Sequence, residues 1–304
     1  MSDLKSYLTD DLIFCARGLE AGHPLSNLLD RALEQYGVPK AGSTVPSILW
    51  GPERYGLDRS PVYLGLEPEA QDEVLQKISR WNLSVSFHIE KSGHSFAAKM
   101  ALLSERMEEK SLYCLIAAEE AIHLRLFENF IRFEPAPVAD CHPMLAPLAR
   151  VIREGSREAC LLMVQVLLEG FGMGHYRSLM EDCRDPALVQ VFQRILKDEA
   201  RHHGAGLVLA KESKSGGEER DEVFESAREV IAALQSAEWV LRALEEVAGP
   251  MSQDARKKHF EAVGQVRMLE ERLRSAREML LKAERDQLVN RLEREGVFRV
   301  REMD

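Results

Sequence analysis

Six residues that can bind a metal ion fall into two sets with the same spacing. In each set, a Glu is followed 30 positions later by a second Glu, and a His comes three residues after that. The two sets are Glu90, Glu120 and His123, and Glu169, Glu199 and His202. Four carboxylates and two imidazoles are the ligands that hold a pair of iron or manganese ions inside a four-helix bundle. The pattern therefore predicts a dinuclear metal site.

The spacing within each set suits a helical hairpin. Residues three apart on a helix share one face, with Cβ atoms roughly 5–6 Å apart, so the second Glu and the His of a set can face one metal pair. The first Glu must then come from the preceding helix. The midpoint of the first set falls in the polar stretch 104–110, and that of the second set falls near Pro186, which stops a helix. Hairpins that turn there bring both Glu residues to the same height, about 20 Å from the turn.

A Glu and a His three residues apart are a weak signal alone. The chain contains a third such pair, Glu20 and His23. No residue of this chain lies 30 positions before Glu20, and Gly22 and Pro24 mark a helix end rather than a helix interior. The prediction therefore rests on the repeat of the full pattern, and Glu20 and His23 are not predicted ligands.

An acidic residue precedes the second Glu in both sets, Glu119 in the first and Asp198 in the second. Metal-bound His residues usually donate their other ring N–H to a carboxylate, which fixes the tautomer. We expect Glu119 and Asp198 to accept these hydrogen bonds across the two hairpins. The alternative is a pair of solvated acids on exposed helix faces.

Two further histidines lie close to the predicted ligands in sequence. His94 follows Glu90 by one helical turn on the same face, so it is either a seventh ligand or an ordinary hydrogen-bonded His. His203 follows His202 directly and points in another direction.

The neighbours of the six residues argue against a set of solvated surface charges. Glu169 follows the run 161–168, which is apolar at nearly every position, and Glu120 follows the apolar stretch 115–118. An ionised carboxylate is almost never buried among such residues unless it is paired or binds a metal. We therefore expect the six residues to lie inside the protein.

Two tyrosines and several glycines lie one or two turns from the predicted ligands. Tyr113 precedes the second Glu of its set by seven residues, and Tyr176 follows the first Glu of its set by seven. Each can be a redox relay, the wall of a substrate pocket or part of the core. A glycine inside a helix costs about 1 kcal/mol, so it indicates either close helix packing or space for substrate or O₂. The glycines are Gly93, Gly170, Gly172 and Gly174.

The composition limits the kinds of protein and partner that the chain can be expected to have. The chain has 304 residues, 45% of them hydrophobic, which is ample for a large core, and a net charge of −10. Because no Lys/Arg-rich block is present, nucleic acid and an anionic membrane are poor partners. The five cysteines are scattered without a C-x-x-C pair, as in a protein of the reducing cytosol. We find no signal peptide and no membrane-spanning run, and expect a cytoplasmic protein.

The pattern along the chain predicts an all-α fold. Four long helices are expected to carry the ligands, at 67–103, 108–133, 148–182 and 186–210, with a crossover at 134–147. Further helices are expected at 2–20, 24–36, 220–247 and 252–295, around an irregular stretch at 37–66. We divide the chain into an N-terminal extension at 1–66, a metal-binding bundle at 67–210 and a C-terminal extension at 211–304. In the last helix, apolar residues from Val266 to Leu280 form a stripe that packs either on the bundle or on a second copy, as in a homodimer.

Residues 67–210 resemble the ferritin-like dinuclear carboxylate oxidases and oxygenases. The repeated pattern, with an acid before each second Glu, is similar to that of the p-aminobenzoate N-oxygenase group. The stretch from Leu168 to Tyr176 resembles the third helix of the aldehyde-deformylating oxygenases. At Ile195 the chain differs from the N-oxygenases, which carry an additional His there. The resemblance implies a ferritin-like four-helix bundle with additional helices at both ends, two Fe ions bridged by carboxylates, and O₂ chemistry; Mn in one or both positions stays open.

Three functions fit these expectations. The first is an O₂-dependent di-iron oxidase or oxygenase that acts on a small organic substrate in an apolar pocket and takes electrons from an external donor. The second is a ferroxidase or iron-handling protein without an organic substrate, although the long extensions argue against a storage cage. The third is a helical interaction module that keeps the ligands for stability only.

Overall fold

The computed structural model describes residues 23–37, 46–131, 133, 135, 142–213, 220–236 and 239–300. Throughout these residues the secondary structure is helical and contains no strand, which confirms the all-α prediction. The helix expected at 2–20 lies outside the described residues. The helix expected at 24–36 is present as α2 (Pro24–Glu34).

The first predicted hairpin is formed by α4 (Pro68–Leu103) and α5 (Met107–Glu128), which pack against each other along their length. Ser104 ends α4 with extended backbone and donates its hydroxyl to the Met100 carbonyl, 2.7 Å away. The polar stretch at 104–106 therefore makes the turn. α5 is shorter than the predicted 108–133, because the backbone turns after Glu128.

The second hairpin differs from the prediction of one helix over 148–182. The chain forms a separate helix α6 (Leu145–Glu154), because Gly155 is extended and the Ser156 hydroxyl caps a new helix at Ala159 N, 3.2 Å away. The new helix runs without a break through α7 (Arg157–Cys160), the π-helical segment η5 (Leu161–Leu168) and α8 (Glu169–Glu181).

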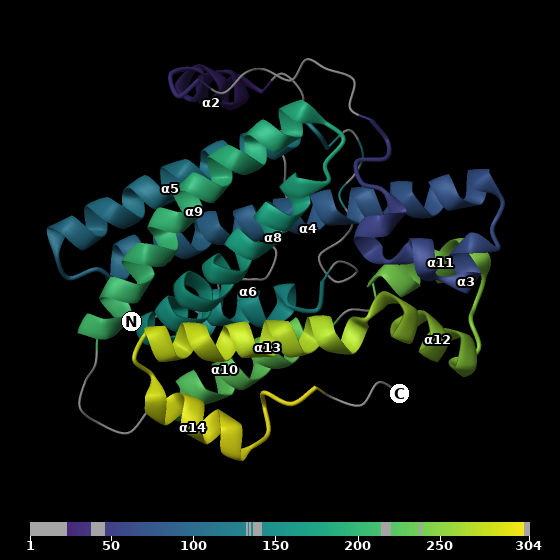
Figure 1. Cartoon of the computed structure of the whole chain (residues 1–304). Helices are drawn as coiled ribbons and strands as arrows, with labels where there is room; N and C mark the ends of the chain where they lie inside the picture. Colours follow the sequence, from purple (N-terminus) through teal and green to yellow (C-terminus); the bar gives the residue numbers. More distant parts are fainter. Residues whose placement is uncertain are drawn as a thin grey trace.

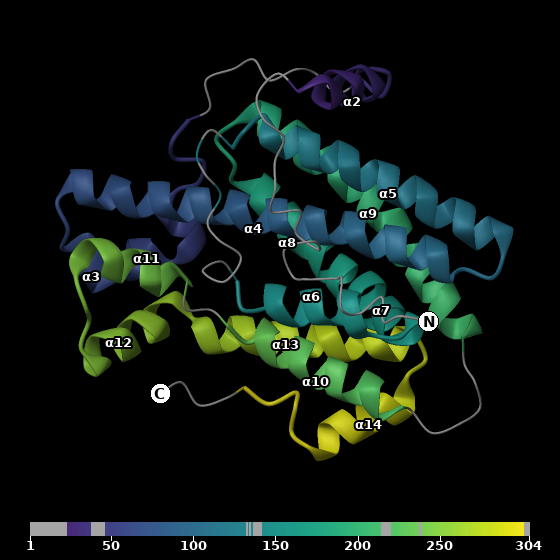
Figure 2. The same ribbon diagram turned by 180° about the vertical axis from the view of Figure 1, so that it is seen from behind.

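The returning helix of the second hairpin is α9 (Pro186–Glu212), which packs against α8 and η5. It begins where predicted, because Pro186 occupies its first turn and the Asp185 carboxylate accepts the N–H groups of Ala187 and Leu188 at 2.8 and 3.0 Å. α9 also contacts α5, so the two hairpins lie side by side (Figures 1 and 2).

A second layer of helices covers the face of η5 that points away from α9 (Figures 1 and 2). It consists of α6 together with α10 (Asp221–Leu234), α13 (Gln265–Lys282) and α14 (Asp286–Arg294). Buried side chains of α10, α13 and α14 belong to the same hydrophobic cluster as those of α4, α5 and η5. All eight residues of η5 are buried. The division of the chain into three segments stays a prediction.

The C-terminal part contains more helices than the two predicted at 220–247 and 252–295. The first is divided into α10 and α11 (Trp239–Ala248), and the second into α12 (Gln253–Val263), α13 and α14. Gly264 ends α12 in the left-handed conformation, with φ 69°. Residues 46–66, expected to be irregular, form the short helices η2 (Pro52–Tyr55), η3 (Leu57–Arg59) and α3 (Pro61–Leu64). These pack with α11 and α12 at one end of α4.

The apolar stripe of the C-terminal region packs inside this chain. Leu269, Leu273, Ala276 and Leu280 are buried, whereas Val266 is 48% exposed. Of the two alternatives, the stripe therefore takes the first, and a homodimer stays a prediction.

One helix of the described chain, Arg157–Glu181, is long and apolar enough to cross a membrane by length and composition, although we expected none. Its most apolar window is 67% buried inside the protein. A core helix of a soluble protein has the same properties, so this helix is weak support for a membrane span.

Candidate dinuclear metal centre

The structure brings all six predicted ligands together. Glu90 comes from α4, two residues from α5, Glu169 from the start of α8 and two residues from α9. All are buried, with at most 7% of the surface of any residue exposed. Their oxygen and nitrogen atoms form two groups, each with ligand atoms within 4.8 Å of one another. The first group is Glu90, Glu120, His123 and Glu199, and the second is Glu120, Glu169, Glu199 and His202.

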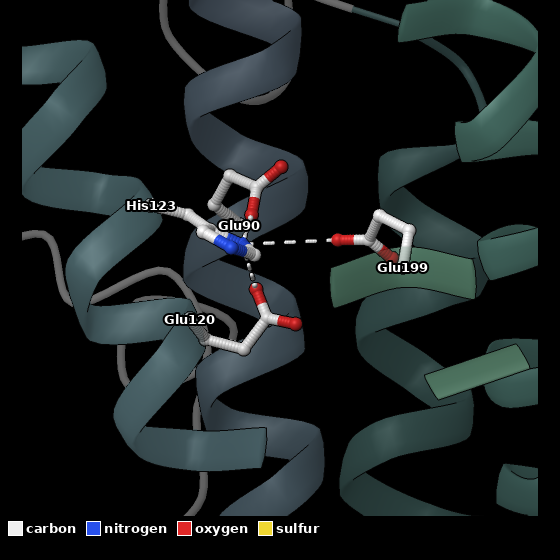
Figure 3. Close-up of side chains that lie close together, drawn as sticks. All are labelled: Glu90, Glu120, His123 and Glu199. Carbon is white, nitrogen blue, oxygen red and sulfur yellow. Dashed lines mark hydrogen bonds and ion pairs between the residues drawn. The ribbon is translucent and has the colours of Figure 1, made fainter. Parts of the chain in front are cut away.

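In the first group the Nδ1 atom of His123 faces three carboxylates (Figure 3). It lies 2.9 Å from Glu90 Oε2 and 3.6 Å from Glu120 Oε2. It lies 3.8 Å from Glu199 Oε1, which reaches across from the other hairpin. Three helices therefore converge on one nitrogen atom.

The second group repeats this arrangement around Nδ1 of His202. This atom lies 3.4 Å from Glu120 Oε1, 3.7 Å from Glu169 Oε2 and 3.8 Å from Glu199 Oε2. Glu120 and Glu199 thus turn one oxygen toward each histidine, whereas Glu90 and Glu169 each belong to one group. Two shared carboxylates between two imidazoles are what a pair of carboxylate-bridged metal ions requires.

The outer nitrogens of the histidines bond to the two predicted acids, and the bonds cross between the hairpins. Nε2 of His123 lies 3.1 Å from Asp198 Oδ2, and Nε2 of His202 lies 2.8 Å from Glu119 Oε2. Each acid fixes the ring so that Nδ1 points to the cluster. Arg201 joins the two acids, with one guanidinium nitrogen 2.5 Å from Glu119 Oε1 and 2.9 Å from Asp198 Oδ1. We did not predict Arg201, although its position three residues after Asp198 signals this ion pair.

The carboxylates of the cluster interact strongly. Burial and the charge of Glu120 raise the pKa of Glu90 to about 8, against the effect of the nearby imidazole. Burial and the charge of Glu169 raise the pKa of Glu199 well above its usual value. Burial also opposes ionisation of Glu120, but the two imidazoles that face it outweigh burial and lower its pKa. The cluster therefore holds more negative charge than it can keep without cations or protons.

The surrounding carboxylates raise the pKa values of the two histidines. Burial alone would lower their pKa values, but the hydrogen bond to Asp198 and the facing carboxylates raise the pKa of His123 well above its usual value. Glu119 and the facing carboxylates raise the pKa of His202 in the same way. The carboxylates thus attract positive charge to both rings, and metal ions bound there would compete with protons.

The donor set fits a pair of metal ions. Nδ1 of His202 is buried and makes no hydrogen bond, which is costly unless an ion binds it. Four buried carboxylates and two imidazoles supply the hard oxygen and nitrogen donors that iron and manganese accept. Glycine at position 93 is also required, because a Cβ atom there would lie 2.9 Å from the carboxylate carbon of Glu120.

The tyrosines occupy different places around the cluster. Tyr176 is buried and donates its hydroxyl to Glu90 Oε1, while its ring packs with Phe127 and Phe192. Tyr113 donates its hydroxyl to Gln165 Oε1 at 2.7 Å and does not contact a ligand directly. Sequence reasoning missed Gln165, the one polar residue in the apolar run of η5.

The three glycines of α8 divide into two kinds. A Cβ atom at Gly170 would collide with the sulfur of Met279, so this glycine serves close packing against α13. A Cβ atom at Gly172 or Gly174 would meet no other atom within 4 Å. Close packing therefore does not explain the latter two, and space beside Glu169 stays a prediction.

The remaining histidines lie outside the two groups. His94 is half-buried on α4 and belongs to neither group, so the structure does not bring it to the cluster. His203 is also half-buried and lies beside Gly170. His23 is exposed and caps α2, with its Nδ1 atom accepting the N–H of Leu25 at 3.1 Å. His23 is thus a helix cap, as the glycine and proline beside it indicated.

Comparison of the chain with protein-family models and with curated proteins found no match.

Proposed function

We propose that this protein is an O₂-activating dinuclear metalloenzyme of the ferritin-like type, in which α4, α5, α7–η5–α8 and α9 form the four-helix bundle. The observation that supports this most is the pair of shared carboxylates, Glu120 and Glu199, each with one oxygen toward each histidine. The resemblance to the dinuclear carboxylate oxidases and oxygenases adds the expectation of iron, with manganese as the alternative. A small organic substrate and an external electron donor in the cytoplasm complete the proposal.

The six ligands would give each of the two ions one histidine and three carboxylates. His123 and Glu90 would bind one ion, His202 and Glu169 the other, and Glu120 and Glu199 both. The four carboxylates would balance the charge of two divalent ions fully, which lets the centre lie in an apolar core. Two ferrous ions held in this way would supply an O₂-binding site and two electrons, which the external donor would then restore.

The residues around the ligands would keep the centre rigid and dry. Asp198 and Glu119 hold the two imidazoles with their Nδ1 atoms inward. The Tyr176 hydroxyl occupies one oxygen of Glu90, and its ring closes the cluster together with Phe127 and Phe192. Apolar walls of this kind exclude bulk water from a reactive centre.

A substrate would approach along α8. Gly172 follows Glu169 by one turn, is half-buried and leaves open space where another residue would place a side chain, whereas Gly174 is exposed. An enzyme with an organic substrate would need such a route, whereas a protein that handles iron alone would not. The additional layer of α6, α10, α13 and α14 on the bundle also has no role in a compact storage subunit.

Oxygen consumption by the iron-loaded protein tests the proposal. The protein is loaded with Fe(II) without oxygen, mixed with O₂ and a chemical reductant, and followed with an oxygen electrode in the presence of a library of small organic acids, amines and aldehydes. We expect O₂ uptake that one substrate class stimulates and that yields an oxidised organic product. Uptake that stops after Fe(II) is oxidised, with no organic product, would favour a ferroxidase, and no uptake would favour an interaction module.

A further inference from the structure

We propose that Gln165 is a positioning residue for the His202 half of the centre, and that Tyr113 and Gly206 exist to hold it there. The inference rests on the proposed metal centre, because it assigns a role to residues that do not touch the ions.

Gln165 connects three helices inside the core. Its Nε2 atom donates to the main-chain oxygen of His202 at 2.9 Å, and its Oε1 atom accepts the Tyr113 hydroxyl at 2.7 Å. Both Gln165 and Tyr113 are fully buried. A carbonyl oxygen can only accept, so the NH₂ end of the amide must face His202, and the Oε1 end is then free to accept the tyrosine hydroxyl. The His202 carbonyl thus fixes the orientation of Gln165, and Tyr113 holds its other end.

The position of Gln165 on η5 places it over the same residue that Glu169 reaches. Glu169 follows Gln165 by four residues, and its Oε2 atom lies 3.7 Å from Nδ1 of His202. One stretch of helix therefore contacts His202 twice, through Gln165 at the main-chain oxygen and through Glu169 at the ring. This stretch is where the chain adopts π-helical geometry, which is rare and is frequent at functional sites. The amide therefore fixes where His202 lies along the helix axis relative to Glu169.

Gly206 lets α9 approach the amide closely. A Cβ atom at this position would lie 2.8 Å from Gln165 Cγ and 3.0 Å from its main-chain oxygen. In an α-helix the N–H of residue 206 bonds to the carbonyl of residue 202. Gly206 therefore lies in the same helical turn as the carbonyl to which Gln165 donates. Any larger residue would push this turn away from η5.

Cobalt binding tests the proposal without relying on activity. Gln165→Met removes the amide at similar volume, Tyr113→Phe removes one oxygen atom, and Gly206→Ala moves the helices apart. Each variant is titrated with Co(II) without oxygen, and the visible absorption of the bound ion is recorded. We expect one Co(II) to bind as in the unchanged protein. The second should bind about 10-fold or more weakly with altered absorption bands, as for other residues that hold ligands in place.

Asn82 and Tyr55 provide the matched control. Asn82 is a buried amide on α4 whose Nδ2 atom donates to the Tyr55 hydroxyl at 2.8 Å, and neither residue contacts a ligand. Asn82→Leu and Tyr55→Phe should reduce the urea midpoint of the metal-free protein as the test variants do, while both Co(II) ions bind unchanged.

The outcomes separate the two proposals. Unchanged binding of both ions by Gln165→Met and Tyr113→Phe would overturn the role of Gln165. Weakening of cobalt binding by the control variants in the same proportion would overturn it as well, because it would show a general loss of stability. If the unchanged protein binds fewer than two Co(II) ions, the metal centre itself is wrong.

Discussion

At the scale of single residues, substitution of the two histidines gives the most specific prediction, since each is the only nitrogen donor of its group. His123→Ala and His202→Ala should each reduce bound iron from two equivalents to one or fewer and abolish O₂ consumption. Helix content, measured by circular dichroism, should stay nearly intact because the helices are held by other contacts. His23→Ala, at the exposed cap of α2, should change neither iron content nor O₂ consumption. Equal effects of all three substitutions would mean that the repeated pattern is not a site.

The two outer acids support a second prediction at this scale. Glu119→Gln and Asp198→Asn keep the shape of each side chain but remove the charge that holds an imidazole. Each should weaken iron binding by roughly 10- to 100-fold, with little effect on the fold. Glu225→Gln, in an exposed ion pair with Arg228, is the matched control and should bind iron normally. Normal iron affinity in both outer-acid variants would show that these hydrogen bonds do not support metal binding.

Gly93 gives a third prediction. Gly93→Ala places a methyl group 2.9 Å from the Glu120 carboxylate carbon, and Glu120 must then move away from its position between the histidines. Because Glu120 belongs to both groups, both ions should bind more weakly, as seen in Fe(II) titrations. Gly204→Ala on α9 meets no atom within 4 Å and serves as the control. Iron affinity in Gly93→Ala equal to that of the control would contradict the shared role of Glu120.

At the scale of helices, the open space along α8 can be tested with Gly172→Leu. If the space admits substrate or O₂, this variant should keep two metal ions and its unfolding midpoint but react slowly. If the position is closely packed instead, the side chain should overpack the core and cost about 1–3 kcal/mol. Thermal denaturation, metal content and O₂ uptake are measured on the same variant. A loss of stability in step with the loss of activity would count against a pocket at Gly172.

The helices show what the sequence could and could not predict. The ends of α4 and α9 follow from Ser104, Asp185 and Pro186, which act locally, and the identical spacing of the two sets predicted the cluster. The break at Gly155 was missed because one glycine among the polar residues 153–158 is compatible with the exposed face of a continuous helix. The π-helical geometry of η5 was missed because no residue type in an apolar run distinguishes a π-helix from an α-helix.

At the scale of the whole molecule, the C-terminal helices could not be placed from the sequence. Their apolar stripe was compatible with the bundle or with a second copy, since both partners offer an apolar face. The structure buries Leu273 and Leu280 in the same cluster as Phe96 and Tyr113. The layer over η5 thus stabilises the helix that carries Glu169.

The metal content of the whole protein tests the central claim most directly. The protein is stripped of metal with a chelator, incubated with excess Fe(II) without oxygen, desalted and analysed for iron against protein concentration. The two buried groups that share Glu120 and Glu199 predict close to two equivalents of iron per chain, and a higher unfolding temperature for the loaded protein than for the stripped protein, because ligands that bind only the folded state stabilise it. A single tightly bound ion, or no retained iron and no change in unfolding temperature, would contradict the dinuclear centre.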